Sequence, residues 1–365
     1  MPPLTYLSTF PSSITSLTYN PLPPSRYVSC AVYVEPTEDY PSGLIYTGCQ
    51  DGKIRSFLPD LEEPLHVLEG HAENVTSIYV GKFGTLVSGS WDMTAKVWMD
   101  RTCKTTLTGH TFAVWAVAIL PTVGVMVTAS ADKTVKLWKA GVCTHTLTGH
   151  TDAVRALAVV SSEQFLSAGN DASVRRWSSS GECLGSYYGH TNYIYSLVLL
   201  GEGGDEWVTS GEDRSVRVWR GGEVRQTLYL PAISVWSVAT LQNGDIAAAT
   251  NDGCLRLFTR DAARVAEPEI LTAFEEELGK VELAAQAELG GIKLTDLPGP
   301  EALFEPGRKD GQQKMVREGE AVSVHGWSMA EQRWEKIGDV VGAAGGSTAS
   351  SGKKLYKGKE YDCEN

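Results

Sequence analysis

The chain has 365 residues, of which 42% are hydrophobic and 21% are charged, and its formal net charge is -12. This length and apolar content can bury one large core and a second, smaller one, whereas the acidic balance excludes the basic footprint that nucleic-acid binding needs. No apolar run approaches 18 residues and no charged-then-apolar leader is present. We therefore expect a soluble intracellular protein with neither a membrane span nor a secretory signal.

Residues 1–26 form an N-terminal segment rich in proline, serine and threonine, in which residues 5–10 alternate as a strand does. After this segment, an aspartate followed six positions later by tryptophan or phenylalanine recurs six times, at intervals of 41, 40, 39, 42 and 39 residues. A period of about 40–45 residues is typical of a WD40 propeller blade. The six pairs are Asp51 and Phe57, Asp92 and Trp98, Asp132 and Trp138, Asp171 and Trp177, Asp213 and Trp219, and Asp252 and Phe258.

The repeats predict an all-β fold, a WD40 propeller with six recognisable blades over residues 27–262. In such rings the outer strand of the last blade usually comes from the N-terminus. We therefore expect residues 5–10 to pair beside residues 255–258 and six blades to close into a complete ring.

A second series, of Gly-His pairs, precedes four of these aspartates by 21 to 23 residues. In each such blade the aspartate can accept a hydrogen bond from the imidazole, which reaches a strand hydroxyl that in turn meets the indole N–H of the tryptophan. A buried polar chain of this kind makes a blade rigid when every member is satisfied, so we expect these histidines to be structural. The four tetrads are His71, Ser88, Asp92 and Trp98; His110, Thr128, Asp132 and Trp138; His150, Ser167, Asp171 and Trp177; and His190, Thr209, Asp213 and Trp219.

Residues 263–310 read as a helix followed by an acidic linker. Pro268 in the first turn, early acids and Gly279 at the end predict a short amphipathic helix. Residues 311–365 read as a small separate module in which strands are expected at residues 322–327, 334–337 and 354–361.

Several runs resemble one known family in a specific way. They are GKFGTLVSGSWD (81–92), SADKTVKLW (130–138), YGHTNYIYS (188–196), LPAISVW (230–236), IGDVVG (337–342) and LYKGKEYD (355–362). Through them, residues 27–362 resemble the phospholipase A(2)-activating protein family. The resemblance implies a seven-bladed propeller followed by a ubiquitin-binding module.

The resemblance further implies a non-catalytic, ubiquitin-binding adaptor in ubiquitin homeostasis and in the degradation or sorting of ubiquitinated proteins, located in the cytoplasm and nucleus. The family works with the AAA ATPase segregase. Compared with the family pattern, the first blade is replaced by residues 1–26, and the chain stops just inside the ubiquitin-binding module, before the ATPase-binding domain. ATPase recruitment is therefore not expected of this chain as it stands.

A binding face is expected where the inner strands begin. In each blade, the third and fifth residues after the histidine position and the residue before the repeat aspartate point there. Tryptophan, tyrosine and arginine are enriched at binding hot spots, and exposed aromatic clusters often mark interaction surfaces. The expected ubiquitin-binding residues are Trp91, Trp115, Arg155, Tyr193, Tyr195, Glu212, Trp236 and Asn251.

Two alternatives to this interpretation stay open. Some of these side chains could pack between blades, and the propeller could be a generic scaffold for a different peptide partner. An enzyme is not expected, because the sequence offers no paired carboxylates in a cleft and no Ser/His/Asp set outside the tetrads. The seven cysteines have no CxxC spacing, so we expect reduced thiols, no metal site and no cofactor.

Overall fold

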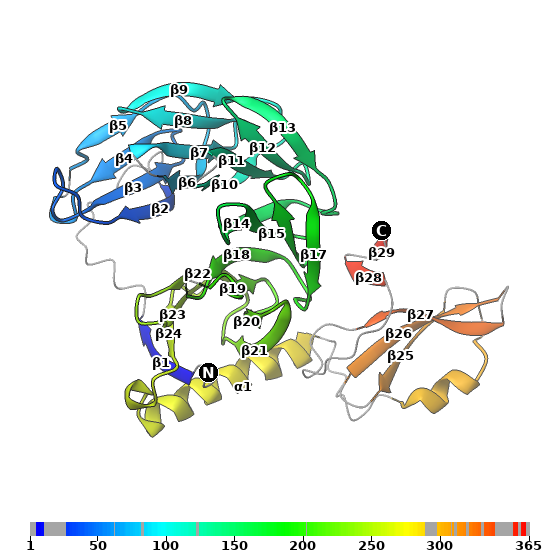
Figure 1. Ribbon diagram of the computed structural model, residues 1–365. Coiled ribbons are helices and arrows are strands. Elements are labelled where there is room, and N and C mark those ends of the chain that lie inside the picture. Colours follow the sequence, from blue (N-terminus) through cyan, green and yellow to red (C-terminus); the bar gives the residue numbers. More distant parts are fainter. Residues whose placement is uncertain are drawn as a thin grey trace. The chain divides into compact units, whose positions relative to one another are not determined.

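A computed structural model gives the structure of the chain (Figure 1). It describes residues 5–10 and 27–362, except for 62, 82–83, 122–123, 202, 289–297, 308, 310–311, 319–320, 330–331, 340–352 and 357–358. The chain divides into two compact units, Met1–Leu271 and Thr272–Asn365, which are described separately.

The larger unit consists of six four-stranded antiparallel sheets, here called blades one to six in chain order (Figure 1). Within a blade each strand pairs with the next one along the chain. Blades one to three are β2 (Val28–Val34), β3 (Leu44–Cys49), β4 (Ile54–Phe57) and β5 (His66–Leu68); β6 (Val75–Val80), β7 (Leu86–Ser90), β8 (Ala95–Met99) and β9 (Thr102–Leu107); and β10 (Val114–Leu120), β11 (Val125–Ser130), β12 (Val135–Lys139) and β13 (Val142–Leu147).

Blades four and five repeat this order, and blade six takes its outer strand from the N-terminus. They are β14 (Val154–Val159), β15 (Gln164–Gly169), β16 (Ser173–Ser178) and β17 (Cys183–Tyr188); β18 (Ile194–Leu199), β19 (Glu206–Gly211), β20 (Ser215–Arg220) and β21 (Glu223–Tyr229); and β22 (Val235–Thr240), β23 (Ile246–Thr250), β24 (Leu255–Thr259) and β1 (Thr5–Phe10). The WD40 propeller blades expected from the repeat are confirmed.

The repeat aspartate shapes the turn between the second and third strands of each blade. Asp92 Oδ1 accepts a hydrogen bond from the amide of Thr94, two residues on, at 3.0 Å, which is the Asx-turn geometry. The intervening Met93 has a φ of 65°, a left-handed conformation that is uncommon outside glycine. Blades one and six place Gly52 and Gly253 at this position, so the turn is strain-free there.

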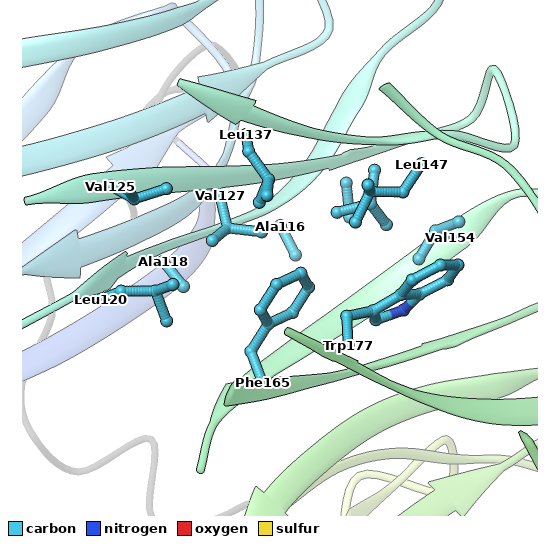
Figure 2. Close-up of a cluster of buried hydrophobic side chains, with 12 residues drawn as sticks. Ala116, Ala118, Leu120, Val125, Val127, Leu137, Leu147, Val154, Phe165 and Trp177 are labelled. Carbon is cyan, nitrogen blue, oxygen red and sulfur yellow. The ribbon is translucent and has the colours of Figure 1, made fainter. Parts of the chain in front are cut away.

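Neighbouring blades share apolar cores. Figure 2 shows the core between blades three and four, where Phe165 and Trp177 from blade four meet Ala116, Val127 and other small side chains of blade three. Small residues such as Ala116 and Ala118 suit the inner strands because these strands lie close together, while the large rings fill the wider space outside them. This shared packing joins the blades into one unit.

The predicted pairing of the N-terminus with blade six is confirmed. β1 runs antiparallel to β24, with Thr5 opposite Thr259 and Phe10 opposite Leu255. The edge of β24 is therefore covered.

The prediction that six blades form a complete ring is wrong. The inner strands pack in succession, β2 on β6, β6 on β10, β10 on β14, β14 on β18 and β18 on β22, but β22 has no comparable packing against β2 among the described residues. On these two strands, residues whose equivalents in blade three are buried are exposed: Val28 is 48% accessible where Val114 is buried, and Ala239 is exposed where Ala118 is buried. The packing between consecutive blades fixes the turn from each to the next, and six blades leave a gap.

The end of the larger unit and the start of the smaller one are joined by helix α1 (Pro268–Glu288). Its predicted end at Gly279 is wrong, because the helix runs through this glycine for nine more residues. A glycine inside a helix costs only about 1 kcal/mol, and the surrounding Glu, Leu, Lys and Ala residues favour the helix strongly enough to offset it.

The smaller unit contains a short 3₁₀ helix, η6 (Pro300–Phe304), a sheet of β25 (Gln313–Glu318), β26 (Ala321–Ser328) and β27 (Arg333–Asp339), and a hairpin of β28 (Lys353–Tyr356) and β29 (Lys359–Asp362). The single strand expected at residues 354–361 is in fact part of this hairpin, in which β28 pairs antiparallel with β29. β25 was not predicted. The domain boundaries drawn from the sequence after residues 26, 262 and 310 stay predictions.

Candidate functional site

Blades two to five each contain a buried chain of hydrogen bonds. In blade three the Trp138 indole donates to Thr128 Oγ1 at 2.8 Å, Thr128 lies 2.7 Å from His110 Nε2, and His110 Nδ1 lies 2.7 Å from Asp132 Oδ2. A carboxylate can only accept, so Nδ1 carries the proton and Nε2 accepts from the hydroxyl. The same contacts join the other three tetrads.

The histidines of the tetrads are not free to act as acids or bases. Burial acts to raise the pKa of the Asp132 carboxyl, but hydrogen bonds from His110 and Thr134 outweigh it and hold that pKa well below its usual range. The side chain of His110 is almost fully buried, and both ring nitrogens are occupied. A histidine held in this way stabilises its blade and is not available as a general base.

In the first and last blades an arginine takes the place of the histidine as the partner of the repeat aspartate. Arg55 donates to both oxygens of Asp51 at 3.1 and 2.6 Å. Arg256 donates to Asp252 at 2.7 Å and to Thr250 at 2.7 Å. These pairs were not predicted. A basic residue stands four positions after the repeat aspartate in all six blades, so the available signal was the missing Gly-His pair in blades one and six.

The aromatic residues expected at the binding face form one continuous cluster. We call it the aromatic face. All of its members lie at the starts of inner strands or in the turns before the repeat aspartates, which the strand order places at the same end of the blades. The cluster comprises Trp91, Trp115, Arg155, Tyr193, Tyr195 and Trp236.

The contacts run from blade two to blade six. Trp91 meets Trp115 edge to face, with ring centroids 6.2 Å apart. The Arg155 guanidinium lies 4.4 Å from the Trp115 ring and 5.4 Å from the Tyr195 ring, and Tyr195 stacks on Trp236 at 4.8 Å. Five successive blades therefore contribute side chains to a single surface.

Polar contacts hold this surface in place. The Arg155 Nε donates to Asn170 Oδ1 at 2.9 Å. The Tyr195 hydroxyl donates to Glu212 Oε2 at 3.0 Å, and the Ser234 hydroxyl donates to the same oxygen. Rings fixed in this way lose little conformational entropy on binding, which favours affinity.

Exposure differs among the expected residues. Trp91 and Trp236 are 47% and 53% accessible, and Asn251 is also exposed. Asn251 uses its side-chain oxygen to accept from the amides of Ile233 and Ser234, so it has a structural role there. The half-buried residues pack largely against one another, and they are Trp115, Arg155, Tyr193, Tyr195 and Glu212.

Two exposed apolar residues at the same end of the blades were missed. Phe112 is 61% and Ile233 65% accessible. They occupy equivalent positions in the loops that enter blades three and six, where blades two, four and five have Glu73, Asp152 and Asn192. An apolar residue at a position that is polar in the other repeats was the signal that could have found them.

The smaller unit has a cavity of about 490 Å³ beside β27. Trp327 and Trp334 meet edge to face at 5.3 Å, and the Trp334 indole donates to the Glu305 carbonyl at 2.7 Å. Gly307 lies so close to Trp327 that a Cβ would clash with the ring. Phe304 lies at the rim and is 87% accessible. The cavity therefore has fixed aromatic walls and an exposed aromatic side chain at its rim.

Neither unit shows the ligand set of a metal centre within the part of the chain that the structure describes, where no three His, Cys, Asp or Glu side chains gather. In the same described residues no helix has the length and apolar character to cross a bilayer.

The comparisons with known proteins match both units. WD domain G-beta repeats match residues 62–99, 101–139, 141–178 and 181–220, and the domain described as PLAA family ubiquitin binding (PFU) matches residues 305–363. A crystal structure of the WD40 beta propeller domain of Doa1 is 37% identical, with a TM-score of 0.59 over 64% of this chain and 80% of that one.

Two curated relatives match almost the whole chain. Phospholipase A-2-activating protein of Xenopus laevis is 56% identical over 93% of this chain and 42% of its own length. Ubiquitin homeostasis protein lub1 of Schizosaccharomyces pombe is 39% identical over 92% of this chain and 46% of its own length. The chain thus spans less than half of each relative. Because WD40 repeats and the PFU domain occur in the same order as the resemblance implies, the chain belongs to the phospholipase A-2-activating protein family.

Proposed function

We propose that the chain is a non-catalytic adaptor that binds ubiquitin or ubiquitinated proteins and serves in ubiquitin homeostasis and ubiquitin-dependent degradation or sorting. The PFU match over residues 305–363 is the observation that carries this proposal. The name of the lub1 relative, a ubiquitin homeostasis protein, supports it. The tetrads support the absence of catalysis, because their titratable groups are committed to holding the blades together.

The aromatic face, together with Glu212 and Asn251, is the proposed ubiquitin contact of the propeller. Ubiquitin presents an apolar patch rimmed by basic residues. Exposed Trp91 and Trp236 offer apolar area to such a patch, and aromatic anchors of this kind often dominate binding energy. Glu212 and the net charge of -12 suit the basic rim, which speeds encounter and fixes orientation.

A scaffold for a different peptide is the second candidate for the propeller. The exposed Phe112 and Ile233 favour it, because they extend the apolar surface beyond a single small patch. The two candidates differ in one simple respect, since only the first requires free ubiquitin to bind the propeller.

Substitution of Trp236 by alanine tests the choice. Truncation of a hot-spot residue costs at least about 2 kcal/mol, roughly thirtyfold in affinity, so Trp236→Ala should remove the propeller component of ubiquitin binding in a calorimetric titration of the full chain. The component that remains should vanish when Phe304→Ala is added in the smaller unit.

Tyr33→Ala is the matched control, because Tyr33 is an equally exposed aromatic residue near the far end of β2. It should bind as the wild type does. If Trp236→Ala and Tyr33→Ala gave the same isotherm, the propeller would be a scaffold for another partner.

The cellular setting follows from the family. We place the chain in the cytoplasm and nucleus, where ubiquitin conjugates are handled. Fractionation of cells tests this placement, and recovery of the chain in a secreted fraction would contradict it.

A further inference from the structure

Arg155 is a half-buried arginine of the larger unit, as Arg175 and Arg176 are, but it lies beside two rings of the aromatic face. Its side chain is half-buried, yet none of the described carboxylates forms an ion pair with it, and its only hydrogen bond among the described residues runs from Nε to Asn170. Arg55 and Arg256, by contrast, each meet an aspartate at 2.6 or 2.7 Å. Both terminal nitrogens of Arg155 are therefore left for a ligand.

The surroundings of Arg155 make an anion favourable. Burial lowers the pKa of the Arg155 guanidinium, and Asp152 opposes this shift only in part and forms no ion pair with Arg155 among the described residues. Such a group is costly unless an opposite charge or hydrogen-bond acceptor meets it. The adjacent Trp115 Nε1 is likewise buried without an acceptor among the described residues. Two neighbouring donors thus lack an acceptor at one place.

Glu212 does not fill this role. Its carboxylate accepts from Tyr195 and Ser234 and forms no ion pair with Arg155 among the described residues. The aromatic face therefore presents a free cation in blade four and a satisfied anion in blade five, with the Tyr195 ring in contact with both groups.

We propose that Arg155, between the rings of Trp115 and Tyr195, binds the free C-terminal carboxylate of ubiquitin. This inference rests on the part of the proposed function in which free ubiquitin binds the propeller, and it names the group of ubiquitin that Arg155 contacts. The basic rim of the ubiquitin patch would repel Arg155, so the matching group must be a carboxylate that reaches in beside that patch. The tail of ubiquitin ends in two glycines, which have no side chains to collide with the flanking rings. A guanidinium can hold its terminal carboxylate through two parallel hydrogen bonds.

Three forms of ubiquitin test the proposal against the full chain. They are intact ubiquitin, ubiquitin without its last two residues, and ubiquitin whose terminal carboxyl is joined by an amide bond to the side chain of lysine. Loss of a charge-assisted hydrogen bond weakens binding by about tenfold to a hundredfold. We expect the second and third forms to bind the propeller more weakly by this factor, and the amide signals of the two terminal glycines of labelled intact ubiquitin to shift on binding.

Arg155→Gln should abolish the difference among the three forms and the shifts of the terminal glycines. Arg225→Gln, which removes an exposed arginine from a surface pair on β21, is the control and should keep both. Equal binding of the three forms by the wild type overturns the inference while leaving ubiquitin binding intact. An equal loss for all three forms in Arg155→Gln would mean that Arg155 contacts the folded part of ubiquitin, and that also overturns it. Absence of binding by every form contradicts the proposed function itself.

Discussion

At the scale of single residues, each tetrad depends on its repeat aspartate, which accepts several hydrogen bonds at once. Asp132 accepts from His110, from the amides of Thr111 and Thr134, and from the Thr134 hydroxyl. Removal of this carboxylate leaves several donors without an acceptor, and each buried donor left unsatisfied costs about 1–3 kcal/mol.

Asp132→Ala should therefore lower the free energy of unfolding by about 1–3 kcal/mol at neutral pH. The folded-state pKa of Asp132 lies below its unfolded value, so its contribution is fully present above about pH 4 and is lost as the pH falls below that value. Urea unfolding at pH 7 and at pH 3.5 measures both effects. The difference between wild type and variant should shrink in acid.

Asp60→Ala is the control for this experiment, because Asp60 is exposed in a turn after β4. It should unfold as the wild type does at both pH values. An Asp132→Ala variant with unchanged stability at pH 7 would show that the tetrad does not hold the blade.

At the scale of elements, β1 matters because it comes from far away in the sequence. It covers the edge of β24 with a continuous antiparallel pairing. An uncovered strand edge is a template for aggregation. Deletion of residues 1–10 should therefore make the protein aggregate, whereas deletion of residues 1–4, which precede the strand, should not. Light scattering during storage at one concentration measures this. A soluble chain without residues 1–10 would contradict the role of β1.

The sequence predicts the elements that depend on residues close together in the chain, and it does not predict those that depend on contacts between distant residues. The tetrad positions of Asp132 and Trp138 recur with the repeat, and so do the turns beside them, which made the blades and the aromatic face predictable. The end of α1 depends on the summed helix propensities of the residues around Gly279, so the glycine alone did not predict where the helix ends. The gap between β22 and β2 depends on which residues meet across blades, and the spacing of the repeats does not contain that information.

At the scale of the whole molecule, the two units offer two aromatic surfaces, one at the starts of the inner strands and one beside β27. We propose that the first of these binds ubiquitin. Trp115 and Tyr195 flank Arg155 from either side, so their simultaneous truncation should remove the surface without touching a tetrad.

The most direct measurement is a titration of isotopically labelled ubiquitin with the full chain carrying Phe304→Ala, with and without Trp115→Ala and Tyr195→Ala, followed by chemical shifts. We expect shifts in the apolar patch of ubiquitin for the chain with an intact aromatic face. These shifts should be lost in the chain that also lacks both rings, with the melting temperature nearly unchanged. Identical shifts with and without the two rings, or no shifts in either case, would contradict ubiquitin binding by the propeller.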